Sequence, residues 1–258
     1  MGNREFNAIT IKDELVAWIR DWFERNGKNC IAVIGISGGK DSSVVAALCK
    51  EALGVNRVFG VMMPNGEQKD ISDSIALCEH LGIKNTTINI APAVNAIIDS
   101  LKAAEKVGRI SEQAMINTPA RVRMTTLYAV SQTFGNGRVV NTCNLSEDIA
   151  GFSTRYGDSV GDFSPLARLT TDEVVAIGDV LGLPYELTHK TPSDGLCGKS
   201  DEDSLGFKYS VENVYIRTGV CEDEVSKRLI DERFKKNLFK LELMEHYEPR
   251  LNNTFIPW

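Results

Sequence analysis

The stretch over residues 30–43 constrains this chain more than any other. An apolar run over 31–36 leads directly into the turn Ser37-Gly38-Gly39-Lys40-Asp41-Ser42, and a helical pattern follows. Glycines let a backbone approach a ligand closely, and the first N–H groups of a helix attract anions. The hydroxyls of Ser37 and Ser42 and the ammonium of Lys40 add further donors. The sequence therefore predicts a strand, a tight turn and a helix that together bind a phosphate chain.

Two other motifs share part of this stretch. A Walker A loop would need a glycine where this chain has Ile34, and a hydroxyl after the lysine where it has Asp41. Residues 35–39 also fit the Gly-x-Ser-x-Gly nucleophile elbow. That motif needs an earlier βα loop and a late histidine, and we find one preceding helix and no histidine in a persuasive setting. A glycine turn that binds nothing would leave the two serines, the lysine and the aspartate unexplained.

Strand and helix patterns alternate along the first two thirds of the chain. Apolar runs predict strands over 31–36, 58–63, 86–90 and 138–142. Helical spacing predicts helices over about 10–23, 43–53, 71–81, 92–106, 119–134, 171–181 and 222–245, with a polar linker over 108–117 and long loops over 148–165 and 184–202. This alternation predicts an α/β fold, a doubly wound parallel sheet with helices on both faces. We expect a single domain over 1–258, with the core sheet in about 28–170 and a helical C-terminal part over about 171–258.

Composition and charge narrow the class of protein. The 258 residues are 43% hydrophobic and 25% charged, which is ordinary for a globular protein. A formal charge of −6 disfavours a nucleic-acid partner. None of the six cysteines forms a Cys-x-x-Cys pair, so neither a zinc site nor a redox pair is indicated. We see no leader peptide and no transmembrane run, and we expect a cytoplasmic location with no membrane partner.

The carboxyl ends of the predicted strands bring polar residues together. Ligands of parallel α/β sheets bind beyond these ends, which places 37–42, 63–68 and 142–147 around one crevice. Mg²⁺ takes one or two carboxylates together with phosphate oxygens. Asp41 in the first segment and Glu147 in the third are therefore the predicted metal ligands.

Several motifs carry a resemblance to known enzymes. The turn at 37–42 resembles the Ser-Gly-Gly-x-Asp-Ser signature of the PP-loop ATP pyrophosphatases, which cut ATP between its α- and β-phosphates. The stretch Gly-Phe-Ser-Thr-Arg-Tyr-Gly-Asp at 151–158 is very similar to one in the ammonia-dependent NAD synthetases. Further matches follow in order at 119–124, 141–147, 192–196 and 201–209, and weakly near the C-terminus. The resemblance covers about residues 10–258 and implies an adenine nucleotide alpha hydrolase-like fold with extra C-terminal helices.

This resemblance implies a reaction and a set of site residues. The reaction is the ATP-dependent amidation of nicotinic acid adenine dinucleotide (deamido-NAD) to NAD with ammonia, through an acyl adenylate, with release of AMP and pyrophosphate. The implied ATP contacts are Gly35, Ile36, Ser37, Gly38, Gly39, Lys40, Asp41, Ser42, Gln68, Thr142 and Ser193. The implied deamido-NAD contacts are Arg121, Arg155, Asp162 and His246.

The catalytic residues implied in the same way are Lys40, Asp41, Glu147 and Asp162. Lys40 would hold the departing pyrophosphate, and Asp162 or Asp158 would help to take a proton from ammonium. Mg²⁺ is the implied cofactor and a homodimer the implied assembly. We see no glutaminase region, so free ammonia or a separate ammonia-supplying enzyme would provide the nitrogen.

The chain departs from the family at four cationic positions. Arg155 stands where the family carries lysine, and the lost cations are at Met62, Thr171 and Tyr247. Either Lys40 and Lys190 compensate for the missing positive charges, or the enzyme has a different substrate from the family or is slow. Two further alternatives stay open: a related PP-loop enzyme with another acceptor, such as a tRNA-thiolating or nucleotide-aminating one, and a non-catalytic adenine nucleotide sensor.

Overall fold

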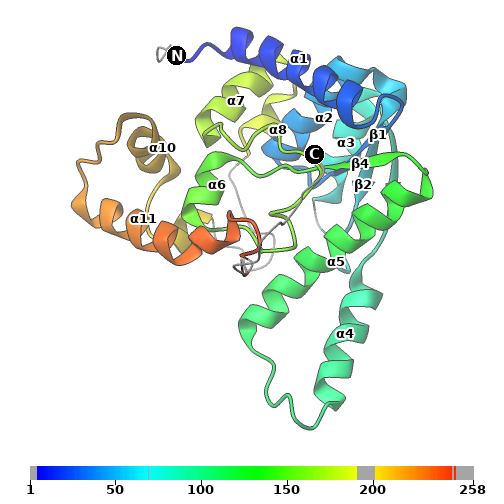
Figure 1. Ribbon diagram of the computed structural model, residues 1–258, viewed down its shortest axis with the longest axis vertical. Coiled ribbons are helices and arrows are strands. Elements are labelled where there is room, and N and C mark those ends of the chain that lie inside the picture. Colours follow the sequence, from blue (N-terminus) through cyan, green and yellow to red (C-terminus); the bar gives the residue numbers. More distant parts are fainter. Residues whose placement is uncertain (1–4, 69, 191–200, 246, 248–258) are drawn as a thin grey trace, which may run out of the picture.

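The computed structural model describes residues 5–68, 70–190, 201–245 and 247. At its centre lies a four-stranded parallel sheet in the order β3-β2-β1-β4 (Figure 1). The strands are β1 (Ile31–Gly35), β2 (Val58–Met62), β3 (Lys84–Thr87) and β4 (Gly137–Val140). The strand order reverses beside β1, which pairs with β2 on one side and β4 on the other. Parallel α/β sheets bind their ligands at such a reversal.

Helices cover both faces of the sheet, which confirms the predicted doubly wound α/β architecture. One layer contains α1 (Ala8–Asn26), α2 (Lys40–Leu53), α3 (Ile71–Leu81) and α7 (Thr171–Val180). The other contains α4 (Ala91–Ala103) and α5 (Glu112–Thr133). Successive side chains of a strand point to opposite faces, so Ile34 of β1 packs in the first layer and Val33 in the second.

A smaller helical part lies beside α6 (Leu145–Ala150), on the left of Figure 1. It consists of α9 (Asp201–Leu205), α10 (Tyr209–Thr218), α11 (Glu224–Asn237) and the 3₁₀ helix η2 (Leu238–Lys240). Its apolar side chains form a separate core with Ala150 at the end of α6. The C-terminal helices therefore support the element that follows β4. The remaining short helices are η1 (Val55–Arg57) and α8 (Tyr185–Thr188).

The largest difference from the sequence prediction concerns α5. We predicted a polar linker over 108–117 and a helix start at Pro119, and this was wrong because α5 begins at Glu112. The side chain of Ser111 accepts a hydrogen bond from the N–H of Ala114 and caps the helix there. Pro119 lies inside the helix and has no N–H to donate, so one bond of the ladder is lost while the helix continues.

Smaller differences have equally local causes. Helix α2 begins at Lys40, three residues before the predicted start, because Gly39 is its N-cap. Strand β3 lies at 84–87 and not at 86–90, since an edge strand of polar residues shows no apolar run. Helices α6 and α10 were not predicted, and the helix predicted over 222–245 ends at Asn237 and is followed by η2. Within the described ranges, no helix combines the length and apolar character needed to cross a bilayer.

Candidate active site

The predicted phosphate-binding turn joins β1 to α2. Gly38 has a φ of +80°, and a Cβ added there would lie 3.1 Å from the Cβ of Asp73 and 3.1 Å from Ser74 Oγ. Both the left-handed backbone and the close packing therefore require glycine at this position. The turn is held by Ser42 Oγ, which accepts a hydrogen bond from the N–H of Ser37 (3.3 Å) and donates one to the carbonyl of Gly39 (3.1 Å).

The start of α2 offers backbone donors to an anion. None of the side chains that the structure describes caps this helix, and Gly39 serves as its N-cap. The first N–H groups of a helix have no partner within the helix. They and the positive end of the helix dipole are placed where a phosphate chain would bind.

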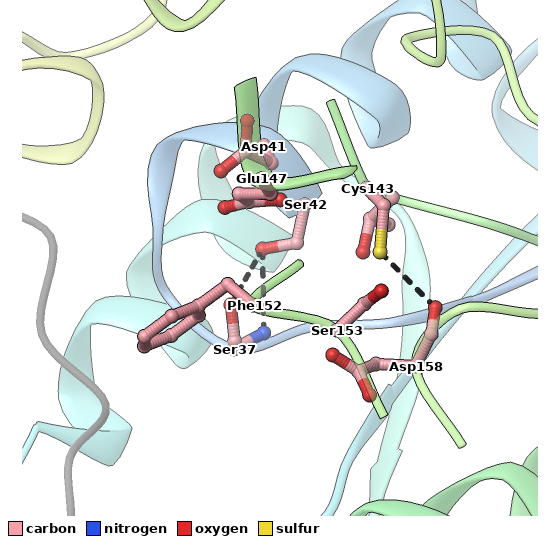
Figure 2. A pocket seen from close by; sticks show the side chains of 9 residues that line it. Ser37, Asp41, Ser42, Cys143, Glu147, Phe152, Ser153 and Asp158 are labelled. Atoms are coloured by element: carbon pink, nitrogen blue, oxygen red, sulfur yellow. Dashed lines mark hydrogen bonds between the residues drawn. The ribbon is translucent and has the colours of Figure 1, made fainter. Parts of the chain in front are cut away.

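A cavity of about 270 Å³ lies at the carboxyl ends of β1 and β4 (Figure 2). The residues that line it come from the glycine turn and α2, from the segment after β4, and from the loop after α6. They are Ser37, Asp41, Ser42, Thr142, Cys143, Glu147, Phe152, Ser153 and Asp158. The structure thus brings together six residues singled out from the sequence: Ser37, Asp41, Ser42, Thr142, Glu147 and Asp158.

Asn144 connects Asp41 and Glu147, two of the three acidic residues that line the cavity. Its Nδ2 donates to Asp41 Oδ1 at 2.9 Å, and its Oδ1 accepts from the N–H of Glu147 at 3.1 Å. Glu147 returns the contact, because its Oε2 accepts from the N–H of Asn144 at 3.3 Å. This reciprocal capping box begins α6 and fixes the backbone that carries Glu147. Asn144 therefore orients both carboxylates.

The electrostatics of the cavity favour a cation. Burial and the Asp41 carboxylate raise the pKa of Glu147 to about 8, an effect that Lys40 partly opposes. Two carboxylates facing one cavity repel each other unless a positive charge lies between them. No cluster of three or more His, Cys, Asp or Glu side chains is placed to hold a metal anywhere in the described ranges. Two carboxylates that leave room for phosphate oxygens fit Mg²⁺.

The loop after α6 contributes Phe152, Ser153 and Asp158 to the lining of the cavity (Figure 2). Its turn is held by Asp158 Oδ1, which accepts from the N–H of Thr154 at 2.8 Å. Asn141, directly after β4, ties this loop to the sheet because its Nδ2 donates to the carbonyls of Asp158 (2.7 Å) and Val160 (3.1 Å). The loop is therefore fixed from both the sheet and its own turn.

Other predicted site residues do not line the cavity. Lys40 is buried and its Nζ lies 2.9 Å from Asp41 Oδ2, so it acts next to the carboxylate. The Nε of Arg121 donates to the carbonyl of Arg155 at 3.2 Å, which joins the two predicted dinucleotide ligands. Gln68 donates to Asp70 Oδ1 at 3.1 Å and lies on the segment after β2. Their ligand contacts stay predictions.

Asp162 takes part in the sheet edge. Its Oδ2 accepts from the N–H of Val139 at 2.7 Å and its Oδ1 from the hydroxyl of Tyr128 at 3.2 Å. With both oxygens engaged, Asp162 holds the segment beside β4, and the catalytic role assigned to it stays a prediction. Ser193 and His246 lie outside the described residues.

The positions that lack the family's cations have structural surroundings of their own. Met62 is buried in the core, and Thr171 starts α7, where its N–H donates to Ser146 Oγ. The side chain of Tyr247 is 86% exposed. Lys190 does not reach the cavity walls, because its Nζ pairs with Asp70 (2.8 Å) and Asp73 (2.7 Å).

The sequence analysis missed the roles of Asn144, Asn141 and the loop residues Phe152 and Ser153. The capping box had a local signal, since Asn144 precedes Glu147 by the three residues that this motif requires. Contacts between separate segments of the chain, such as those of Asn141 with the loop, had no such local signal.

We predict that Asn144→Ala weakens both the fold and the site. Loss of the N-cap should lower the free energy of unfolding by about 1–2 kcal/mol. Loss of the bond to Asp41 Oδ1, and of the cap that fixes the backbone of Glu147, should lower kcat/KM about 10–100-fold, as is typical when a residue behind a metal ligand is removed. Chemical denaturation and steady-state kinetics measure the two effects. Unchanged kinetics in a destabilised variant would contradict the positioning role.

Comparisons with known proteins agree with this geometry. A family model described as NAD synthase matches residues 11–251. The chain belongs to the NAD synthase family. The NH(3)-dependent NAD(+) synthetase of Pyrococcus furiosus is 35% identical to it over 258 residues, covering 97% of this chain and 92% of that protein.

Two solved structures of similar proteins share the fold over nearly the whole chain. The NMN synthetase of Francisella tularensis has a TM-score of 0.86 at 30% identity and covers 96% of this chain and 100% of its own. The NH3-dependent NAD synthetase of Campylobacter jejuni, solved with a nitrate ion, has a TM-score of 0.75 at 27% identity. The match covers 95% of this chain and 100% of that one. The family expected from the sequence motifs is thereby confirmed.

Proposed function

We propose that this protein is a ligase that forms a C–N bond, amidating deamido-NAD to NAD with ATP and ammonia. The observation that carries the proposal is one cavity that joins an uncapped helix N-terminus to two carboxylates linked by Asn144. The first feature suits a triphosphate, and the second suits its counter-cation. The family relation supplies the reaction.

The reaction proceeds in two steps. The nicotinate carboxylate attacks the α-phosphorus of ATP, forming an acyl adenylate, and the bond to pyrophosphate breaks. Ammonia then attacks the acyl carbon, loses a proton, and AMP leaves. The N–H groups at the start of α2 and the ammonium of Lys40 stabilise the charge on the departing pyrophosphate. The walls of the cavity hold the carboxylate and the α-phosphate in line.

Asp41 and Glu147 are the residues that would hold Mg²⁺. Mg²⁺ held there would supply positive charge to phosphate oxygens and so make the α-phosphorus a better electrophile. The side chain of Asn144 donates to the carboxylate of Asp41, and its backbone N–H donates to that of Glu147. Ammonia comes from solution or from a separate enzyme. The cytoplasm is the proposed compartment, which the five free cysteines of the described residues support.

A second candidate substrate is the mononucleotide, nicotinic acid mononucleotide. The specific observation behind it is the TM-score of 0.86 to the Francisella tularensis protein, which is named an NMN synthetase, against 0.75 to the Campylobacter jejuni NAD synthetase. The chemistry at the acyl carbon would be the same, and only the contacts beyond the first phosphate would differ.

One assay tests the function and separates the two substrates. Purified protein is incubated with ATP, Mg²⁺ and ammonia, together with deamido-NAD or with the mononucleotide. We expect NAD from the dinucleotide, with pyrophosphate release that requires the acid substrate. A higher kcat/KM for the mononucleotide would select the second candidate. Pyrophosphate release without either acid, or no amide from both, would contradict the proposal.

We also propose that two copies associate through the projecting helices α4 and α5 (Figure 1). Exposed apolar side chains gather on these helices and their connection: Ile97, Val107, Met115 and Ile116 are each 42–50% exposed. Large exposed apolar side chains of this kind are typical of protein interfaces.

Ile116→Asp should therefore weaken the dimer at least tenfold, because it places a charge in the interface. Light scattering behind size exclusion measures the mass of the particles. Ile9→Asp on α1, also an exposed isoleucine, is the matched control and should stay dimeric. A monomeric unmodified protein would contradict the proposed assembly.

A further inference from the structure

The C-terminal element η2 lies against the loop that lines the cavity. We propose that Lys240 is a positioning residue of the active site, whose ammonium holds this loop in the conformation that binds substrate. The inference rests on the proposed function for its kinetic consequences. Its structural consequence can be measured on the free protein.

Lys240 bridges two carbonyls of the loop. Its Nζ donates to the carbonyl oxygens of Gly151 and Ser153, each at 2.9 Å. Between these carbonyls lies Phe152, and both Phe152 and Ser153 line the cavity. The ammonium therefore fixes the backbone on either side of a cavity residue.

Two further residues on the same face of α11 extend this contact. Arg233 donates from its Nε to the carbonyl of Ala150 at 3.0 Å. The side chain of Asn237 lies so close to Gly151 that a Cβ there would come within 2.3 Å of it. Residues 233, 237 and 240 are spaced at four and three positions, so they point the same way. Together their side chains meet successive residues at the C-terminal end of α6, where cations also complement the helix dipole.

A second contact from η2 reaches Arg155, a predicted dinucleotide ligand. The guanidinium carbon of Arg155 lies 5.1 Å from the ring centre of Phe239 and 5.1 Å from that of Tyr156. Both contacts have cation–π geometry. Neighbouring residues of one short helix thus hold the loop backbone and the side chain expected to touch substrate.

The loop needs such support because its backbone is strained. Tyr156 has a φ of +61°, the only positive φ of a non-glycine residue in the described ranges. Backbones of this kind persist only where the surrounding structure enforces them.

Burial lowers the pKa of Lys240, and the Asp158 carboxylate opposes this effect. Lys240 thus interacts electrostatically with Asp158, the residue whose carboxylate closes the turn of this loop.

The test compares Lys240→Met with Lys240→Arg. The methionine variant keeps the length of the side chain but donates no hydrogen bond, so we expect the KM for deamido-NAD to rise about tenfold or more. The effect on kcat should be smaller, because Asp41 and Glu147 are untouched. The arginine variant keeps the charge and the donors and should recover most of the affinity. Lys235→Met, an exposed position on α11, is the matched control and should behave as the unmodified protein.

Hydrogen exchange provides the readout that does not depend on the reaction. The amides of Thr154, Gly157 and Ser159 are bonded within the loop, and they should exchange about tenfold faster in ligand-free Lys240→Met. Unchanged exchange in the loop would overturn the proposal, and so would faster exchange with an unchanged KM. If the unmodified protein makes no NAD, the proposed function fails, while the exchange comparison still decides whether Lys240 holds the loop.

Discussion

Asp41→Asn and Glu147→Gln should each lower kcat about 1000-fold, and Glu147→Gln should do so without lowering stability. Each substitution keeps the shape of the side chain but removes one of the acidic groups that line the same cavity. One preorganised charged group in an active site typically supplies this much rate enhancement. For Glu147→Gln the free energy of unfolding should stay constant or rise in the absence of Mg²⁺, because the repulsion that raises the pKa of Glu147 is relieved. Asp41→Asn also removes the carboxylate that pairs with buried Lys40, so its free energy of unfolding should fall.

Steady-state kinetics and chemical denaturation of the same samples measure both effects. Glu79→Gln, an exposed acid on α3, is the matched control and should change neither quantity. Rates like those of the unmodified protein in both variants would contradict the assigned metal site. A large loss of stability in Glu147→Gln would show that this carboxylate serves the fold.

Glu212→Gln should stabilise the protein at alkaline pH. Glu212 on α10 is 0% exposed, and neither of its carboxyl oxygens has a hydrogen-bond partner in the described structure. Burial raises its pKa from 4.5 to about 8, and Arg233 only partly opposes this. The folded protein therefore binds a proton that the unfolded chain releases. The stability of the folded protein is therefore not reduced by Glu212 below pH 4.5. It falls as the pH rises from 4.5 to about 8, because the buried carboxyl group must then ionise.

Glutamine has no such charge to bury. At pH 9 the variant should exceed the unmodified protein by on the order of 3 kcal/mol in free energy of unfolding, and at pH 4 the two should be similar. Urea denaturation across this pH range measures the difference, and Glu222→Gln at an exposed position is the control. A difference that does not depend on pH would contradict the ionisation of Glu212 as its cause.

The parts of the site that could be predicted from the sequence follow either from a contiguous motif or from a general rule of parallel sheets. The turn at 37–42 is contiguous, and its glycines and apolar flank are read directly from the chain. Glu147 is far from it in sequence, but the rule that parallel strands end at one edge brings the two segments together. The shared cavity of Asp41 and Glu147 agrees with that rule.

Contacts between segments that are distant in sequence could not be predicted, because no general rule says which of these segments pack together. Lys240 meets the loop from 87 and 89 residues away, and Asn144 reaches Asp41 across 103 residues. Nothing in the sequence near Lys240 distinguishes it from the other lysines at the end of α11. The start of α5 was missed for a different reason, because Pro119 is a stronger local signal than the Ser111 cap that begins the helix.

The central claim is that the N-terminus of α2 binds the phosphates of ATP. A crystal structure with Mg²⁺ and an ATP analogue that resists cleavage tests it most directly. We expect the triphosphate to lie against the N–H groups of the turn at 37–42, with the metal held by the carboxylates of Asp41 and Glu147. A nucleotide bound elsewhere, with this turn empty at saturating concentration, would contradict it.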